Sequence, residues 1–461
     1  MFDCPKVIGQ GSYGYIHCPC LWTTTDSDSD QLLKRSTIVS KILEKEDAKV
    51  EMDKYKLIHA IDPACEFHLG EMVLAHPSER NNTTLAMLDR GQHMVQHLSD
   101  YRLILMKYGG VSVRDYTNNV RSNLDASTLL VPLNHAESVV AFWKETGRLM
   151  RGIECMLHHR MVHHDVKPSN VVYQTNGAYH YRLNYIDFGL VNHMDDIYQS
   201  AIHHDYEFTI FFYNMPPELF FYNQQRFDVW RALSTEERKQ QLTHLCEKKQ
   251  QQKQVPKEEK KDEEDEEEVE EVELPNYSDS LDMSERELKY TDEFEDFLNQ
   301  EMSAAAASKS TENCFNYCTH DAIRDGRDGR DGRDGGDECS KKPPPPPHLF
   351  RPPMKSGLAK HTPVPPLHDA MMEQFADFMM HDIDLYADFH EFIYASMHTM
   401  DIYGLGHTLM YAIIRTHMYL PRPFVREMHS LLREMLDNNL TRRIGIQSLV
   451  ERFATIVPLL L

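Results

Sequence analysis

An acid, a lysine and an asparagine share one polar loop of this chain, and a second acid follows in a glycine turn. The loop residues are Asp165, Lys167 and Asn170, and the second acid is Asp187 of an Asp-Phe-Gly turn. An acid can orient an attacking hydroxyl, and a lysine can offset charge on a phosphoryl group in transit. Side-chain oxygens of an asparagine and an aspartate can hold Mg²⁺ ions. Because short apolar segments, predicted as strands, flank both motifs, the spacing indicates transfer of a phosphoryl group from ATP.

The amino-terminal segment carries a glycine-rich pattern that could bind a nucleotide. Glycines allow the backbone to approach phosphates closely and to point N–H groups at them. The pattern opens into a predicted strand and not into a helix, which disfavours a dinucleotide-binding fold. Taken alone, it is equally typical of a hairpin turn. The residues of this predicted nucleotide loop are Ile8, Gly9, Gln10, Gly11, Ser12, Tyr13, Gly14 and Ile16.

A lysine and a glutamate are predicted to complete the phosphate site. Lys41 ends an apolar strand, from which its ammonium could reach the α- and β-phosphates. The segment 45–61 has apolar residues at helical spacing. Glu51 would pair with Lys41, because it shares its helix face with apolar residues that point to the core. The alternative carboxylates are Glu44 and Glu46.

The order of these elements resembles the eukaryotic-type protein kinase superfamily. After the glycine loop and the lysine come HHDVKPSN at 163–170, Asp-Phe-Gly at 187–189 and Met-Pro-Pro-Glu at 215–218. Lys167 followed by Pro168 is similar to the serine/threonine branch of the family. The resemblance implies an α+β, two-lobed kinase fold. It also implies transfer of the γ-phosphoryl group of ATP to a serine or threonine hydroxyl of a protein substrate, with Mg²⁺ as cofactor.

The resemblance assigns a role to each residue of the loop and the turn. Asp165 would accept or orient the proton of the substrate hydroxyl, and Lys167 would neutralise charge on the migrating group. Asn170 and Asp187 would hold Mg²⁺, which makes Asn170 a catalytic residue as well. The glycine loop and its lysine would bind ATP.

The resemblance also implies two structural contacts outside the catalytic centre. Glu218 would form a buried ion pair with an arginine near the carboxyl terminus, for which Arg443 is the best candidate. Asp401 begins an Asp-Ile-Tyr-Gly-Leu-Gly segment, and its carboxylate would anchor the catalytic loop. Asp228 is a competing anchor, but no glycine follows it at the required position. The choice of Asp401 implies a long insertion before it.

Two short segments and one residue refine this resemblance. Ile-Asp-Pro at 61–63 and Tyr-Gly-Leu-Gly at 403–406 are similar to kinases of large DNA viruses. A viral origin would place the protein in the host cytoplasm or nucleus. His164 stands where the family usually has an arginine that receives an activation-loop phosphate. We therefore expect activity that does not depend on phosphorylation of that loop.

Composition divides the chain into four segments. Residues 1–105 are the predicted N-lobe of strands with one helix, and 106–222 are the first, mostly helical part of the C-lobe. Residues 223–368 form an acidic low-complexity insertion, and 369–461 complete the C-lobe. Within the insertion, residues 256–300 hold twenty acids and five bases. Such sequence buries too little apolar surface to offset the entropy of ordering, so we expect most of the insertion to be disordered.

The overall composition excludes some classes of protein. A net charge of -23 disfavours general binding to nucleic acid or to anionic membranes. No apolar run approaches the ~20 residues that span a bilayer, and no leader peptide opens the chain. Nine scattered cysteines are typical of free thiols in a reducing compartment. We expect a soluble intracellular protein.

Several alternatives remain open at the level of sequence. The acidic tract could bind a basic protein, and Pro343–Pro347 could bind an SH3-type partner. Cys314, Cys318 and His320 have donors for zinc, but their spacing is poor for a structural site. The main functional alternative is a kinase-fold scaffold that acts through its insertion. A kinase-like enzyme for small molecules is a further alternative, but such enzymes generally lack a lysine placed like Lys167.

Overall fold

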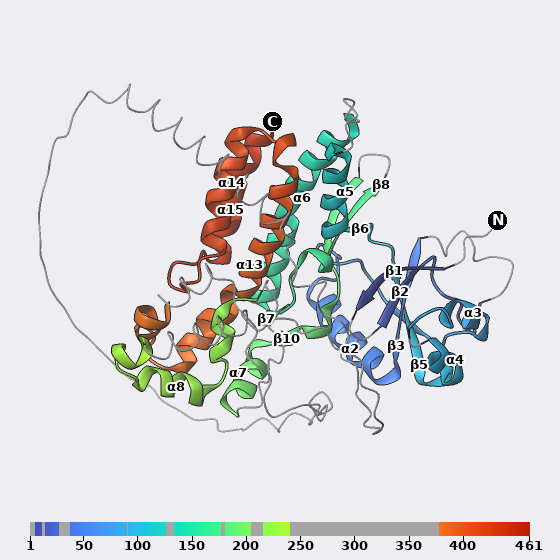
Figure 1. Cartoon of the computed structure of the whole chain (residues 1–461), viewed down its shortest axis with the longest axis horizontal. Helices are drawn as coiled ribbons and strands as arrows, with labels where there is room; N and C mark the ends of the chain where they lie inside the picture. The colour runs from blue at the N-terminus through green and yellow to red at the C-terminus, as the bar shows by residue number, and fades with distance from the viewer. Residues whose placement is uncertain are drawn as a thin grey trace, which may run out of the picture. The chain divides into compact units, whose positions relative to one another are not determined.

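The computed structural model shows an α+β fold of helices and antiparallel sheets (Figure 1), as the sequence predicts. The described residues belong to one structural unit. They are 5–11, 14–26, 37–89, 91–125, 133–176, 180–203, 215–239 and 378–461. Most of the predicted acidic insertion, with its tract of acids, its proline run and its candidate zinc ligands, lies outside the described residues.

Five antiparallel strands near the amino terminus form one sheet, in the order β1-β2-β3-β5-β4. Helix α2 follows β3 directly, packs against β3 and β5, and has the predicted bounds. The elements are β1 (Lys6–Gly11), β2 (Gly14–Cys18), β3 (Ile38–Glu44), α2 (Lys45–Ile61), β4 (Val73–Ala75) and β5 (Tyr101–Lys107).

The register of the strands places Lys41 on one face of this sheet. Lys41 lies opposite Ile16 of β2 and Ile104 of β5, and directly opposed side chains share a face. The next residue, Ile42, is fully buried on the other face. Strand β3 continues to Glu44, so the prediction that it ends at Lys41 was wrong. Two buried apolar residues follow the lysine and carry the strand onward.

Two short helices between β4 and β5 cover the face that carries Ile42. They are α3 (Asn82–Leu85) and α4 (Gly91–Gln96). The core cluster on this side consists of Tyr15, Leu21, Ile42, Leu85, Met94, Tyr101 and Leu103. The expectation of a single helix in residues 1–105 was therefore wrong. Helices of four and six residues are too short to show an apolar period in the sequence.

The remaining described residues are mainly helical. The helices are α5 (Val113–Asp125), α6 (Leu133–His158), α7 (Met194–Ile202), α8 (Gln224–Ala232), α13 (Phe389–Thr416), α14 (Arg422–Met435) and α15 (Ile446–Ile456). The apolar residues of α6 form its buried face. Trp143 on that face is fully buried, its ring packs against Phe424, and its indole N–H donates to Thr416 at 3.2 Å. These contacts join α6 to α13 and α14.

Single helical turns connect these elements. They are η1 (Glu79–Asn81), η2 (Leu98–Asp100), η3 (Pro168–Asn170), η4 (Phe188–Leu190), η5 (Pro217–Phe221), the π-helical η6 (Phe378–Asp382), η7 (Ile383–Leu385), η8 (His417–Tyr419) and η9 (Val457–Leu460).

Two small antiparallel sheets position the polar loop and the glycine turn. One pairs β6 (Val111–Ser112), β8 (Val171–Asn176) and β9 (His180–Tyr185), and the other pairs β7 (Met161–Val162) with β10 (Asn192–His193). The loop precedes β8, and the turn follows β9. Because Val171 pairs with Tyr185, and the amide of Ile186 donates to the carbonyl of Asn170 at 2.9 Å, loop and turn lie side by side.

The start of the predicted insertion differs from expectation. Residues 224–232 form α8, and its Phe227 and Trp230 are buried. Arg238 donates to both carboxylate oxygens of Asp384 and to the carbonyl of Met380. Arg238 therefore joins the last residues described before 240 to the first ones described after 377. The two buried aromatic residues of α8 are the reason that the fold extends past 223.

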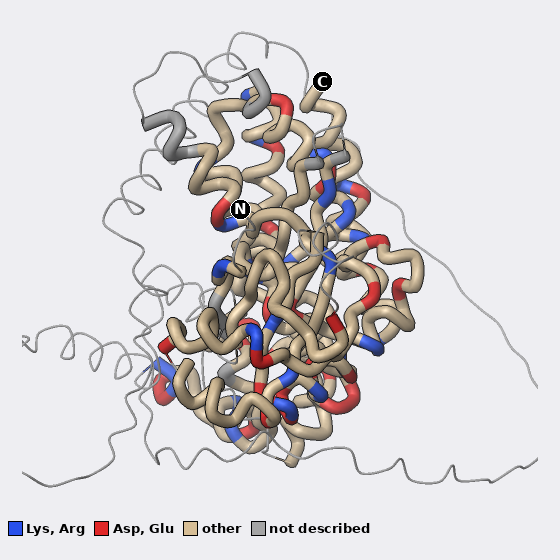
Figure 2. The backbone as a smooth tube through the Cα atoms, turned by 90° about the vertical axis from the view of Figure 1, so that its right-hand side faces the viewer, with Lys and Arg blue, Asp and Glu red and all other residues tan. Residues whose placement is uncertain are grey.

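Charged residues of both signs are interspersed along the described backbone (Figure 2). Of the 23 net negative charges, fifteen come from residues 256–300, outside the described ranges. None of the helices in the described ranges has the length and apolar character needed to cross a bilayer.

Candidate functional site

The polar loop holds Asp165 in a fixed orientation. Lys167 Nζ lies 2.9 Å from Asp165 Oδ2, and Asn170 Nδ2 donates to the same oxygen at 2.7 Å. Asn170 Nδ2 also donates to the Asp165 carbonyl at 3.0 Å. Within the described residues, the buried Oδ1 of Asp165 accepts no hydrogen bond. One oxygen of this carboxylate is therefore held by the loop, while the other remains available as an acceptor.

The protonation of Asp165 follows from its surroundings. Burial raises the pKa of this carboxyl above its usual value, while the charge and hydrogen bond of Lys167 act in the opposite direction. A carboxylate with a raised pKa and an available oxygen can accept a proton from a bound hydroxyl.

Asp401 of α13 anchors this loop, as the resemblance predicted. Its Oδ2 accepts the amide of His163 at 2.6 Å, and its Oδ1 accepts the amide of His164 at 2.9 Å. His164 has a left-handed backbone with φ of 68°, so the two amides can converge on one carboxylate. Burial raises the pKa of Asp401 to about 7, although both N–H donors act to lower it. The competing candidate, Asp228, lies in α8.

The predicted ion pair between Lys41 and Glu51 is present. Lys41 Nζ lies 2.7 Å from Glu51 Oε2, and both residues are buried. Glu44 and Glu46, the alternatives, are exposed. Burial would lower the pKa of Lys41, but the carboxylates of Asp187 and Glu51 outweigh it and raise that pKa. Lys41 is therefore a buried, permanently charged cation.

Asp187 joins the lysine to the polar loop. Its Oδ1 lies 3.6 Å from Lys41 Nζ. Its side chain is 41% exposed, so the carboxylate also faces solvent. Burial acts to raise the pKa of Asp187, but the charges of Lys41 and Lys167 outweigh that effect and lower it. Asp187 adopts a left-handed φ of 60°, which turns the chain sharply after β9.

The structure thus brings together the predicted residues of three distant segments. They are Lys41 and Glu51, then Asp165, Lys167 and Asn170, then Asp187. The cluster combines two lysines with carboxylate and amide oxygens. It can attract a phosphorylated ligand, and its oxygen donors suit Mg²⁺.

The predicted glycine loop is the hairpin between β1 and β2. Gly11 pairs with Gly14 at its end, and Ile16 lies one strand away from Lys41. A Cβ at Gly14 would collide with the carbonyl of Ile42, so packing of β2 on β3 alone requires this glycine. Ser12 and Tyr13 lie outside the described residues, as does the side chain of Gln10.

The ion pair between Glu218 and Arg443 is present as well. Arg443 donates to both carboxylate oxygens of Glu218, at 2.6 and 3.1 Å, and both side chains are fully buried. The pair joins η5 to the segment before α15. It therefore fixes the architecture and does not touch the cluster around Asp187.

Two parts of the neighbourhood were not found from the sequence. Lys54 of α2 donates to Asn192, which follows the glycine turn. The sequence could have indicated Lys54, because it lies three residues after Glu51 on the same helix, but no pattern in the sequence indicated Asn192. The segment 108–110, between β5 and β6, approaches β8 so closely that a Cβ at Gly109 or Gly110 would collide with it. That glycine doublet was a signal in the sequence.

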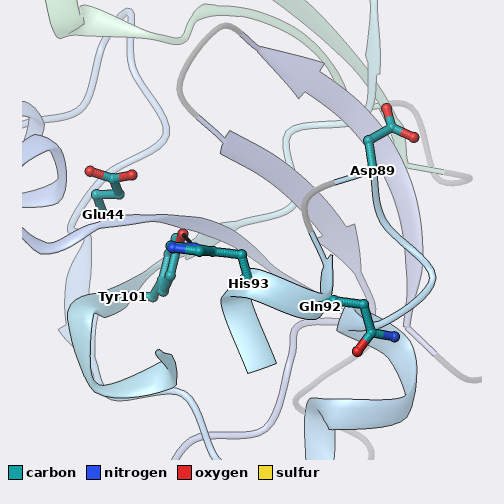
Figure 3. A pocket seen from close by; sticks show the side chains of 5 residues that line it. All are labelled: Glu44, Asp89, Gln92, His93 and Tyr101. Atoms are coloured by element: carbon teal, nitrogen blue, oxygen red, sulfur yellow. Dashed lines mark hydrogen bonds between the residues drawn. The ribbon is translucent and has the colours of Figure 1, made fainter. Parts of the chain in front are cut away.

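A separate hollow of about 530 Å³ lies away from this cluster. Figure 3 shows His93 and Tyr101 side by side in it, between Glu44 and the pair Asp89 and Gln92. His93 and the Tyr101 hydroxyl are 3.3 Å apart. Its lining residues include two carboxylates but no lysine or arginine to attract a phosphate, so this hollow is not the candidate site.

Neither a known protein-family model nor a curated protein sequence matches this chain.

Proposed function

We propose that this protein is a serine/threonine protein kinase with the two-lobed kinase fold. It would transfer the γ-phosphoryl group of ATP to a serine or threonine hydroxyl of a protein, with Mg²⁺. The observation that carries this proposal is the convergence of the Lys41–Glu51 ion pair, Asp187 and the polar loop on one solvent-facing site. Phosphoryl transfer depends mainly on positioning and on electrostatic stabilisation, which these residues can supply.

The two-lobed fold is proposed from the placement of these residues on their elements. Lys41 belongs to the five-stranded sheet and Glu51 to its helix α2, as the N-lobe of a two-lobed kinase fold requires. The polar loop and its anchor Asp401 belong to the helical part. A nucleotide between the two parts would contact the lysine from one side and Asp187 from the other.

The cation of Lys41 would hold the phosphates of ATP. Glu51 keeps its ammonium in place at 2.7 Å. Ile8 and Ile16 of the β1–β2 hairpin would contact the nucleotide, and the backbone of that hairpin would approach its phosphates. The close pairing of Gly11 with Gly14 leaves the hairpin narrow at this point.

The donor set of Asp187 and Asn170 fits a hard divalent cation. Asp187 offers a partly exposed carboxylate whose pKa is lowered, so it stays ionised. Asn170 uses its amide hydrogens on Asp165, and its amide oxygen accepts only a long bond of 3.5 Å from the Ser169 hydroxyl, which a metal could replace. Mg²⁺ bound by these two residues would offset negative charge on the phosphates.

Asp165 would act on the acceptor hydroxyl. Its Oδ2 is held by Lys167 and Asn170, so Oδ1 can accept the hydroxyl proton as the oxygen attacks phosphorus. Lys167, 2.9 Å from the same carboxylate, would stabilise the migrating phosphoryl group. Lys167 followed by Pro168 favours a serine or threonine acceptor.

A transfer assay tests this proposal. Purified full-length protein is incubated with Mg²⁺, γ-labelled ATP and a basic test protein, and the labelled amino acid is identified after hydrolysis. We expect phosphoserine or phosphothreonine, with transfer lost in Lys41→Ala. The matched control is Lys45→Ala, since Lys45 is exposed four residues later and should be dispensable. Absence of transfer by the wild-type protein, or equal transfer by both variants, would refute the proposal and favour a scaffold.

A further inference from the structure

Three potential metal ligands meet beyond the carboxyl end of α2. His59 lies in the last turn of that helix, and Cys65 and His68 lie in the loop that follows it. One ring nitrogen of each histidine and the Cys65 thiol all lie within 4.8 Å of one another. Ligands at bond lengths of about 2.0–2.3 Å around a tetrahedral metal are themselves roughly 3.5 Å apart. Small side-chain shifts would therefore bring these three into coordination.

His59 supplies an independent sign of a ligand. Its Nδ1 is buried and has no hydrogen-bond partner among the residues that the structure describes. A buried polar atom without a partner costs about 1–3 kcal/mol. A coordinate bond would remove that cost.

His68 is oriented as metal-binding histidines commonly are. Its Nε2 lies 3.0 Å from the carbonyl of Asp62, to which it donates in the neutral ring. Such a bond from one ring nitrogen fixes the tautomer and leaves a lone pair on the other. Nδ1 now accepts the amide of Gly70 at 2.9 Å and lies 3.0 Å from the Tyr55 hydroxyl, and a metal would take the place of these two contacts.

Cys65 is held close to the two rings by its backbone. The Cys65 amide donates to the Asp62 carbonyl at 3.0 Å, and the Arg182 guanidinium donates to the Cys65 carbonyl. The thiol makes one long contact of 3.7 Å, to the carbonyl of Pro63, and is half-buried, so an ion can reach it. Lys107 also reaches this loop near Gly70, so a bound cation must be balanced by the thiolate and by Asp62.

We propose that His59, Cys65 and His68 form a binding site for a divalent cation of the Zn²⁺ type. Two imidazoles and a thiolate suit Zn²⁺ and do not suit Mg²⁺. Binding converts the Cys65 thiol to a zinc thiolate and releases its proton to solvent, and water fills the fourth position. The ion would link the end of α2 to the loop 62–70. This site does not depend on the proposed kinase activity.

Titration of the full-length protein with Co²⁺, a spectroscopic substitute for Zn²⁺, tests the site. We expect a thiolate-to-cobalt charge-transfer band that Zn²⁺ abolishes by competition. The variants Cys65→Ser and His59→Asn should each weaken binding by at least about tenfold, because each removes a ligand. The use of two variants guards against a folding defect in either one.

Two controls separate this site from the other thiols of the chain. Cys155→Ser alters a half-buried cysteine whose thiol contacts the carbonyl of Ile61, close to the same loop, and should retain the band. The double variant Cys314→Ser/Cys318→Ser tests the alternative ligands predicted from the sequence and should retain it as well. The proposal is overturned if wild-type protein gives no band. It is also overturned if Cys65→Ser keeps full affinity, or if either control loses the band.

Discussion

Replacement of Glu218 with glutamine should destabilise the protein by about 3–5 kcal/mol, the cost of removing one partner from a buried ion pair. Arg443 Nη1 and Nη2 lie 2.6 and 3.1 Å from the two carboxylate oxygens, and neither side chain is exposed to solvent. Glutamine keeps the size of the side chain and one acceptor oxygen, but it leaves the guanidinium charge buried without compensation. The stacking of Arg443 over Tyr403, at 4.8 Å, cannot replace a full negative charge.

Urea unfolding, followed by circular dichroism and tryptophan fluorescence, measures this effect as a lower midpoint. The matched control is Glu427→Gln, because Glu427 pairs with Arg426 at 3.3 Å on the surface and should change stability by less than about 1 kcal/mol. The double variant Glu218→Gln/Arg443→Met should recover much of the loss, since it leaves no buried charge. An unchanged midpoint for Glu218→Gln would show that this pair is not buried as described. A double variant no better than the single one would show that uncompensated charge is not the cause.

Three further predictions concern the loop anchor, helix α2 and the insertion. The pKa of Asp401 is about 7 in the fold and 3.8 as a free side chain, so its contribution to stability is complete below about pH 4 and is lost as pH rises through about 7. Unfolding measured from about pH 5 to 8 should show roughly 3 kcal/mol of such loss, because about two pH units of that range lie below the folded pKa, and Asp401→Asn should lack it; parallel curves would contradict this. Lys54→Met should slow phosphoryl transfer with less effect on ATP affinity, because the bond to Asn192 orients the segment after the glycine turn. The control Asn192→Asp should retain activity. An equal change in the transfer rate and in the ATP affinity of Lys54→Met would count against this role. Replacement of 240–377 with a short glycine-serine linker should preserve the melting temperature and transfer activity, because Arg238 already holds both ends together; an unfolded product would disprove it.

The sequence predicted which polar residues come together better than it predicted the elements around them. Asp165, Lys167 and Asn170 lie within six residues of one another, so local geometry alone brings them together. The choice of Glu51 over its neighbours followed from helical phase, and the ion pair with Lys41 confirms it.

Other features depend on contacts that no local pattern encodes. The bond between Lys54 and Asn192 joins residues 138 positions apart. The cover formed by α3 and α4 comes from helices too short to give a periodic signal. The sequence does not mark Cys65 and His68 as metal ligands, because they come close to His59 only when the loop after α2 folds back.

The start of the insertion was misplaced for a related reason. Polar residues dominate the sequence after 223, but Phe227 and Trp230 are enough to bury one face of α8. The Trp230 indole N–H donates to the carbonyl of Met379 at 3.0 Å, a partner from beyond the insertion. Composition averaged over a window cannot detect a helix held by two aromatic residues and a distant carbonyl.

The proposed phosphoryl transfer at Asp165 is best tested with Asp165→Asn, by comparing its rate of γ-phosphoryl transfer to a test protein with that of the wild type. ATP binding should be retained, because Asp165 contacts the loop and not Lys41, the lysine proposed to hold the phosphates. We expect the transfer rate of Asp165→Asn to be lower than that of the wild type by roughly 10²–10⁴-fold, with nearly unchanged affinity for Mg·ATP. A variant that transfers phosphate as fast as the wild-type protein would contradict it.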